Sequence, residues 1–259
     1  MKRAFRFTLP LTVVFAVVLL LRPAVAEDRP ALSTINDRLQ QFVAAGQISG
    51  AVTLVAKDGK IAHLGATGLR DVESKREMQD DTIFAIASMT KPVTATALMI
   101  LVDEGKVKLD DPVANYIPQF KNAKLKSGAE PEREIMLTDC LTHTSGVVGD
   151  QQCFDSLEAT GKMLADRPLG FQPGERWQYS PGLNVIGRVI EVASGQPYEQ
   201  FLKERLFDPL GMTDTTFIPN ADQQKRAVTL YKPGKEKGTI EAPKHWINEI
   251  TPARGHNPY

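Results

Sequence analysis

Apolar residues recur at helical spacing in four stretches of this chain. Residues three or four apart across 31–46 predict an amphipathic helix. A longer, mostly apolar helix is predicted over 89–104, a stretch rich in Ala, Leu, Met and Ile with no glycine. Pro92 falls in its first turn, where a missing N–H costs little. Two further helices are predicted over 182–194 and 197–207.

Between the first two helices the pattern changes to one typical of a β-hairpin. Apolar residues over 51–56 predict a strand, and 61–64 begins a return strand. The turn between them contains Asp-Gly, which favours the positive φ angles of a tight hairpin. Residues 107–135 are predicted to be rich in loops, and after about residue 219 the apolar pattern fades.

The amino-terminal residues 1–26 have the layout of a secretory signal. Basic residues come first, then an apolar run over 9–21, then small residues at Ala24 and Ala26. We therefore expect cleavage before Glu27 and an exported protein, periplasmic or secreted. The alternative is an uncleaved amino-terminal anchor, but a bilayer span needs about 20 apolar residues. No stable membrane anchor is expected.

Composition narrows the function classes. Hydrophobic residues make up 42% and charged residues 24%, as in globular proteins, and 31 basic residues balance 31 acidic ones. Without a basic excess, a nucleic-acid partner is not expected. The four histidines are scattered, so neither a metal nor a cofactor is expected. Cys140 and Cys153 either form a disulfide or leave Cys140 as a buried free thiol in an apolar stretch.

The first chemical signal is Ser88, followed three residues later by Lys91. A serine hydroxyl is a weak nucleophile until a base takes its proton. Residues three apart share one helix face, so Lys91 is predicted to lie beside the Ser88 hydroxyl. The alternative is that Ser88 only caps the helix and Lys91 is a solvated first-turn residue.

Further motifs before and after Ser88 give this pair its context. In chain order the motifs are Ile48-Ser49-Gly50-Ala51, Val55-Ala56-Lys57-Asp58-Gly59, Phe84-Ala85-Ile86-Ala87-Ser88-Met89-Thr90-Lys91-Pro92, Leu101-Val102-Asp103-Glu104-Gly105, Leu109-Asp110-Asp111-Pro112-Val113, Leu141-Thr142-His143-Thr144-Ser145-Gly146, Pro173-Gly174, Tyr179-Ser180 and Pro209-Leu210-Gly211-Met212. This succession resembles the serine β-lactamase-related family, which includes class C β-lactamases, β-lactamase-type esterases and penicillin-recognising D-amino-acid peptidases. The resemblance covers about residues 48–217.

The resemblance implies a role for each matching residue. Ser88 matches the nucleophile that becomes acylated, and Lys91 the lysine that helps to remove its proton. Tyr179 matches the general base of the second motif, and either Lys91 or Tyr179 is the kinetic base. A free tyrosine has a pKa of about 10 and is almost fully protonated at pH 7. For Tyr179 to act as a base, nearby positive charge must stabilise its phenolate. His143 matches a position that is not catalytic in the family, and we expect it to be structural.

Two motifs depart from the family pattern. The tyrosine motif is Tyr, any residue, Asn in β-lactamases, but Pro181 stands at the third position here, and nearby Asn184 does not match it. This favours an esterase or peptidase over an efficient β-lactamase. The family's third motif is Lys or His, a small residue and Gly, on a strand well beyond the tyrosine motif. It is absent there: 237–239 read Lys-Gly-Thr, and His63-Leu64-Gly65 precedes Ser88. We therefore expect the family's last strands and helix to be missing, and this chain to be poorly active.

Together these observations predict an α+β protein with the β-lactamase/penicillin-binding-protein-like fold. An antiparallel sheet flanked by helices is expected within an incomplete domain over 27–259, with a helical region over about 89–207. The expected function is that of an exported serine hydrolase, which acts on a small-molecule ester, amide or peptide through an acyl-enzyme on Ser88. The alternative is a non-catalytic module that holds cell-wall peptides or β-lactams in the same cleft. No oligomeric state is inferred.

Overall fold

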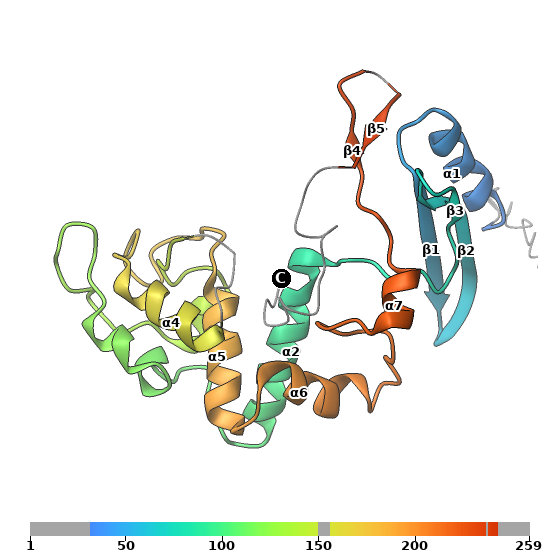
Figure 1. Cartoon of the computed structure of the whole chain (residues 1–259). Coiled ribbons are helices and arrows are strands. Elements are labelled where there is room, and N and C mark those ends of the chain that lie inside the picture. The colour runs from blue at the N-terminus through green and yellow to red at the C-terminus, as the bar shows by residue number, and fades with distance from the viewer. Residues whose placement is uncertain (1–31, 150–155, 237, 243–259) are drawn as a thin grey trace, which may run out of the picture.

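The computed structural model describes residues 32–149, 156–236 and 238–242 of the 259. The predicted signal and Cys153 lie outside the described residues. Figure 1 shows a small sheet with one covering helix on one side and a larger group of helices on the other. Among the described residues, no helix has both the length and the apolar character needed to cross a membrane.

The predicted hairpin is present and forms most of a three-stranded antiparallel sheet. Its strands are β1 (Gly50–Lys57), β2 (Lys60–Asp71) and β3 (Arg76–Glu77), in the order β1-β2-β3. The turn adopts positive φ at Asp58 (51°) and Gly59 (71°), as predicted for Asp-Gly. The strand β2 continues to Asp71, beyond the 61–64 stretch that the sequence predicted. Its second half carries small residues and lacks a strong apolar alternation, so the sequence pattern did not identify it as a strand.

The first predicted helix, α1 (Thr34–Ala44), covers one face of this sheet. The side chain of Asn36 approaches Gly65 of β2 so closely that a Cβ at Gly65 would lie 2.4 Å from its Oδ1. A small residue is therefore needed where the helix meets the strand. Leu54, Ile61 and Leu64 of the sheet are exposed large apolar side chains.

The helical region holds the main hydrophobic core. Its long helices are α2 (Thr90–Asp103) and α5 (Gly182–Ser194), which pack against each other. The next helix, α6 (Tyr198–Leu202), continues into one π-helical turn, η4 (Lys203–Phe207). All three sequence predictions in this region are confirmed to within a residue or two. Gly105 ends α2 at a φ of 69°, the left-handed conformation expected of a glycine at a helix carboxyl end.

Between α2 and α5, the described residues form four short helices that were not predicted from the sequence. They are the 3₁₀ turns η2 (Val113–Asn115) and η3 (Pro118–Asn122) and the helices α3 (Leu137–Leu141) and α4 (Leu157–Asp166). Three of them are five residues or shorter, too short to show helical periodicity. The fourth, α4, has a regular buried stripe that the sequence analysis missed, and Gly161 of that stripe lies against Ile117 of the neighbouring loop.

Cys140 lies fully buried in α3 and is free. Burial, reinforced by the charge of Asp139, raises the pKa of its thiol to about 12. The thiol is therefore protonated and inert near neutral pH.

The polar segment after residue 219 folds back onto the sheet. Asn220 caps the short helix α7 (Ala221–Arg226), with its side chain accepting hydrogen bonds from two backbone N–H groups. A small hairpin follows, made of β4 (Lys232–Pro233) and β5 (Ile240–Glu241). In Figure 1, α7 lies between α2 and the β1–β2 hairpin.

Candidate active site

Ser88 sits at the junction between the sheet side and the helical region. It lies in the 3₁₀ turn η1 (Ala87–Met89), directly before α2, and is exposed. Ala87 has a φ of 44°, a conformation that non-glycine residues adopt rarely and at a cost of about 1–3 kcal/mol. Such strain persists only where the surrounding structure over-determines the conformation.

Lys91 lies on the first turn of α2 and is only 8% exposed. Its Nζ donates a hydrogen bond of 3.3 Å to Ser88 Oγ, so the three-residue spacing brings the two side chains together as predicted. Ser88 is not the residue that caps α2: the position before the helix is Met89.

Tyr179 reaches the same hydroxyl from a loop that is 91 residues further along the chain. Its phenolic oxygen lies 2.7 Å from Ser88 Oγ and donates to it. Lys91 Nζ lies 4.7 Å from the centre of the Tyr179 ring. The structure therefore brings together all three residues that the sequence singled out.

The electrostatics of this cluster act on Tyr179. Burial of the phenol is the largest single influence on its pKa and raises it. Hydrogen bonds with Lys91 and Ser88, and the charge of Lys91, outweigh burial and lower the pKa of Tyr179 below 10. A lowered pKa increases the phenolate fraction, the form that is able to accept the Ser88 proton.

His143 supports the loop that carries Tyr179. Its ring packs against the rings of Tyr179 (centroids 4.7 Å apart) and Trp177 (6.0 Å apart). Its Nδ1 accepts a hydrogen bond of 3.2 Å from the Ser180 backbone N–H, and its carbonyl accepts one from the N–H of Gln178. Burial, and then the charge of Lys91, lower the pKa of His143, so its imidazole is neutral near pH 7. Each of these contacts fits a structural role.

An ion pair between exposed Arg133 and buried Asp139 fixes the segment that leads to His143. Asp139 is almost fully buried in α3 and accepts two hydrogen bonds from Arg133, at 2.6 and 2.9 Å. It also accepts from the Met136 backbone N–H and from the Thr144 hydroxyl. A buried carboxylate requires such partners. The sequence analysis did not single out this pair.

The residues of the two departing motifs lie as follows. Pro181 stands directly before α5, and Asn184 is fully buried within that helix. Of 237–239, Lys237 lies outside the described residues, while Gly238 belongs to the β4–β5 hairpin and lies against Gly46 at the end of α1. His63 lies on β2, where its Nε2 is 2.9 Å from the Thr53 hydroxyl. Within the described ranges, no cluster of three or more His, Cys, Asp or Glu side chains is suited to a metal ion.

Known proteins share both sequence and fold with this chain. A protein from Mycobacterium tuberculosis, Rv1367c, is 38% identical over 215 residues, which is 75% of this chain and 54% of the relative. Esterase EstB of Burkholderia gladioli is 37% identical over 220 residues, 76% of this chain and 55% of the relative. AmpH of Escherichia coli, a D-alanyl-D-alanine carboxypeptidase/endopeptidase, is 30% identical over 241 residues, 87% of this chain and 60% of the relative. The chain thus spans little more than half the length of these relatives.

Solved structures show the same architecture. EstCE1, a hydrolase with promiscuous acyltransferase activity, superposes with a TM-score of 0.75 at 27% identity, over 83% of this chain and 59% of its own. The simvastatin synthase LovD of Aspergillus terreus gives a TM-score of 0.69 at 26% identity, over 82% and 60%. The model of the Beta-lactamase family matches residues 35–255. This chain therefore belongs to the β-lactamase family of serine hydrolases and penicillin-binding proteins, and has its α+β fold.

Proposed function

We propose that this chain belongs to an exported serine hydrolase, with a signal peptide at 1–26 and hydrolase residues from 27 to 259. It acts on a small-molecule ester, amide or peptide through an acyl-enzyme on Ser88. The observation that supports this most directly is the convergence of Lys91 Nζ and the Tyr179 hydroxyl on Ser88 Oγ.

In the proposed mechanism, the Tyr179 phenolate accepts the Ser88 hydroxyl proton while Oγ attacks the substrate carbonyl carbon. The charge of Lys91 stabilises that phenolate. When the tetrahedral intermediate collapses, Tyr179 returns the proton to the leaving alcohol or amine, and the acyl group stays on Ser88. Water then attacks the acyl carbon and loses its proton to Tyr179. As the second tetrahedral intermediate collapses and the acid leaves, Tyr179 returns that proton to Ser88 Oγ, which restores the free serine and the phenolate. His143 stays neutral and holds the Tyr179 loop.

We favour esters and peptides over β-lactams as substrates. The esterase and carboxypeptidase relatives act on those classes by name. Pro181 has no side-chain amide to hold the acylamide of a β-lactam, and Asn184, being fully buried in α5, does not replace it.

The test is covalent labelling followed by turnover. A fluorophosphonate should label the wild-type chain at Ser88, located by peptide mass spectrometry, and Ser88→Ala should stay unlabelled. Lys91→Met and Tyr179→Phe should each slow labelling and the hydrolysis of a short-chain p-nitrophenyl ester by at least ~100-fold. Full activity in Ser88→Ala would refute the proposal, and labelling without ester turnover would instead indicate a covalent sensor.

A further inference from the structure

The strap that carries the nucleophile, residues 84–88, is thinly packed. It crosses from the sheet to the start of α2 (Figure 1), and all five of its residues are exposed. Phe84 is 41% and Ile86 39% exposed, so burial of apolar surface contributes little to its position. Its carboxyl end is fixed, because α2 packs into the helical core.

The amino end of the strap is held at Ile83 by the chain that leaves α7. The Ile83 N–H donates to the Arg226 carbonyl at 3.1 Å, and the Ile83 carbonyl accepts from the Val228 N–H at 2.9 Å. These two hydrogen bonds form a parallel bridge between Ile83 and Ala227. The bridge lies five residues before Ser88 and four before the strained Ala87.

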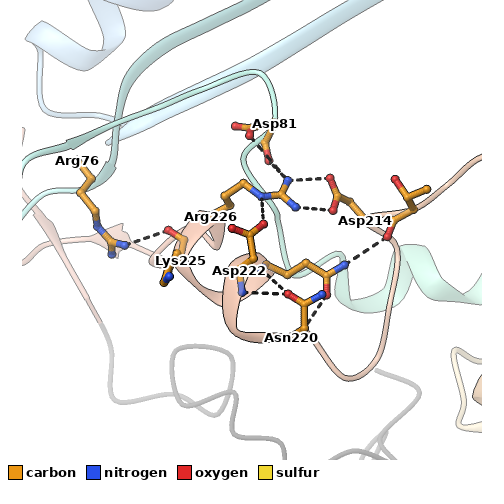
Figure 2. A network of polar contacts seen from close by, with 9 residues as sticks. Arg76, Asp81, Asp214, Asn220, Asp222, Lys225 and Arg226 are labelled. Atoms are coloured by element: carbon orange, nitrogen blue, oxygen red, sulfur yellow. Dashed lines mark hydrogen bonds and ion pairs between the residues drawn. The ribbon is translucent and has the colours of Figure 1, made fainter.

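The side chain of Arg226 fixes this bridge in turn (Figure 2). Its guanidinium binds Asp214 through two hydrogen bonds, at 2.7 and 2.5 Å, and donates to the Asp81 carbonyl at 3.0 Å. Its Nε donates to Asp222 at 3.3 Å. One side chain, itself 20% exposed, thus ties the turn before the strap to α7 and to the loop before α7.

The α7 end is itself anchored to the sheet. Arg76 of β3 donates to the Lys225 carbonyl at 3.2 Å. Thr229 donates from its hydroxyl to Asp71 at 2.6 Å and from its N–H to the Arg70 carbonyl at 2.9 Å. The segment that carries Arg226 is therefore itself attached to β2 and β3 by hydrogen bonds.

We infer that Arg226 is a positioning residue for the nucleophile: through the Ile83 bridge it holds the strap so that Ala87 stays at positive φ and Ser88 faces Lys91 and Tyr179. This inference rests on the proposed function of Ser88. A strained conformation persists only where the surrounding structure over-determines it, and α2 constrains the strap from its carboxyl end alone. Releasing the other end should let Ala87 relax and move Ser88 away from its partners.

The expected effect is on the rate of the chemical step and not on binding. A displacement of a nucleophile by about 1 Å can cost up to ~100-fold in rate. In fluorophosphonate labelling at varied probe concentration, Arg226→Met should lower the maximal labelling rate about tenfold, with the half-saturating concentration unchanged within about twofold. Arg226→Lys, which retains a charge for Asp214, should recover part of the rate.

A second measurement does not depend on reactivity. Hydrogen exchange should accelerate for the Ile83 and Val228 amides, which form the bridge, in Arg226→Met and stay unchanged in α5. Asp214→Asn is the milder variant, to be used if Arg226→Met fails to fold, and should give a smaller change in both measurements. The control is Arg188→Met, which removes a similarly buried arginine paired with Glu158 and Glu191 between α4 and α5.

The inference is overturned if folded Arg226→Met labels at the wild-type rate, or if its Ile83 and Val228 amides stay as protected as in the wild type. It is also overturned if Arg188→Met slows labelling equally, since the effect would then be one of general stability. If the wild type is not labelled at Ser88, the proposed function fails, and hydrogen exchange still decides whether Arg226 holds the strap.

Discussion

The helical region and the sheet side of this molecule are stabilised in different ways. The main core cluster runs from Ala97 to Phe207, so each of its members belongs to the helical region or its loops. On the sheet side, α1 has no fully buried residue, and Leu54 and Ile61 are 58% and 63% exposed. Hydrogen bonds and ion pairs of the 225–231 segment hold this side instead.

This difference matters because the candidate site spans both regions. Lys91 and Tyr179 belong to the well-packed helical region, while the strap to Ser88 begins on the sheet side. The stability of the site should therefore depend on the core for two of its residues and on polar contacts for the third. The predictions below test this contrast, from the largest expected effect to the smallest.

Removing apolar volume should affect the two regions unequally. Leu101→Ala in α2, where the side chain is fully buried, should lower the free energy of unfolding by about 2–5 kcal/mol, because it leaves a cavity. Leu54→Ala on the exposed sheet face should change it by less than about 0.5 kcal/mol. Urea titrations followed by circular dichroism measure both, and equal losses would abolish the contrast.

Backbone geometry should matter most on the sheet side. Gly68 of β2 has a φ of 79°, and an added Cβ would lie 2.4 Å from the Ser49 carbonyl oxygen. Gly68→Ala should cost about 2 kcal/mol or more and accelerate hydrogen exchange in β1 and β2, but not in α5. Gly59→Ala is the matched control: its φ is 71° with open space around the Cβ, so it carries the strain without the clash. Equal costs would mean that the close approach is unimportant.

The anchoring of the sheet side should depend on pH. Hydrogen bonds from the Ser74 side chain, from Thr229 and from the Ser74 N–H lower the pKa of Asp71 well below its usual range, against the effect of burial. A lowered folded-state pKa means that the stabilisation is present above the unfolded pKa of about 3.9 and is lost as pH falls towards the folded value. Asp71→Asn should therefore cost about 1–2 kcal/mol at pH 7, and the difference from wild type should shrink below about pH 4.

The control for Asp71→Asn is a carboxylate that lacks the hydrogen bonds found around Asp71. Asp110, an exposed residue of the helical side, provides it. Asp110→Asn should leave the free energy of unfolding within about 0.5 kcal/mol of wild type at pH 7 and at pH 3. A constant difference between Asp71→Asn and wild type from pH 7 to pH 3, measured by urea titration, would contradict the assignment.

The smallest expected effect concerns the strained residue itself. Ala87→Gly removes the cost of a positive φ but adds freedom to the unfolded chain, so stability should rise by no more than about 1 kcal/mol. Ala85→Gly, in the same strap but without a positive φ, should instead lose about 0.5 kcal/mol. Thermal unfolding of both variants measures the difference, and a loss in both would show that Ala87 is not strained.

The elements that the sequence predicted well are those with a strong local signal. The helices over 89–104 and 182–194 bury much of their surface, so their apolar pattern is dense, and the turn at Asp58 needs only its own dipeptide. The pairing of Ser88 with Lys91 likewise follows from helix geometry alone. The helix α3, with five residues, is too short to carry such a signal, so its helical state depends on packing against neighbours. The helix α4 does carry one, a buried stripe at 157, 160, 161, 164 and 165 with Ser156 as its cap, and the sequence analysis missed it.

The sequence alone therefore determined the hairpin, the long helices, the family and the spacing of Lys91 from Ser88. Tertiary structure alone decided that Tyr179, 91 residues away, lies 2.7 Å from Ser88 Oγ, and that Arg226 donates to the Asp81 carbonyl in the turn before the strap. The physical reason is the distance along the chain over which each effect acts. Periodicity and turn chemistry act within a few residues of the chain, whereas the pKa of Tyr179 and the strain at Ala87 depend on groups that only folding brings together.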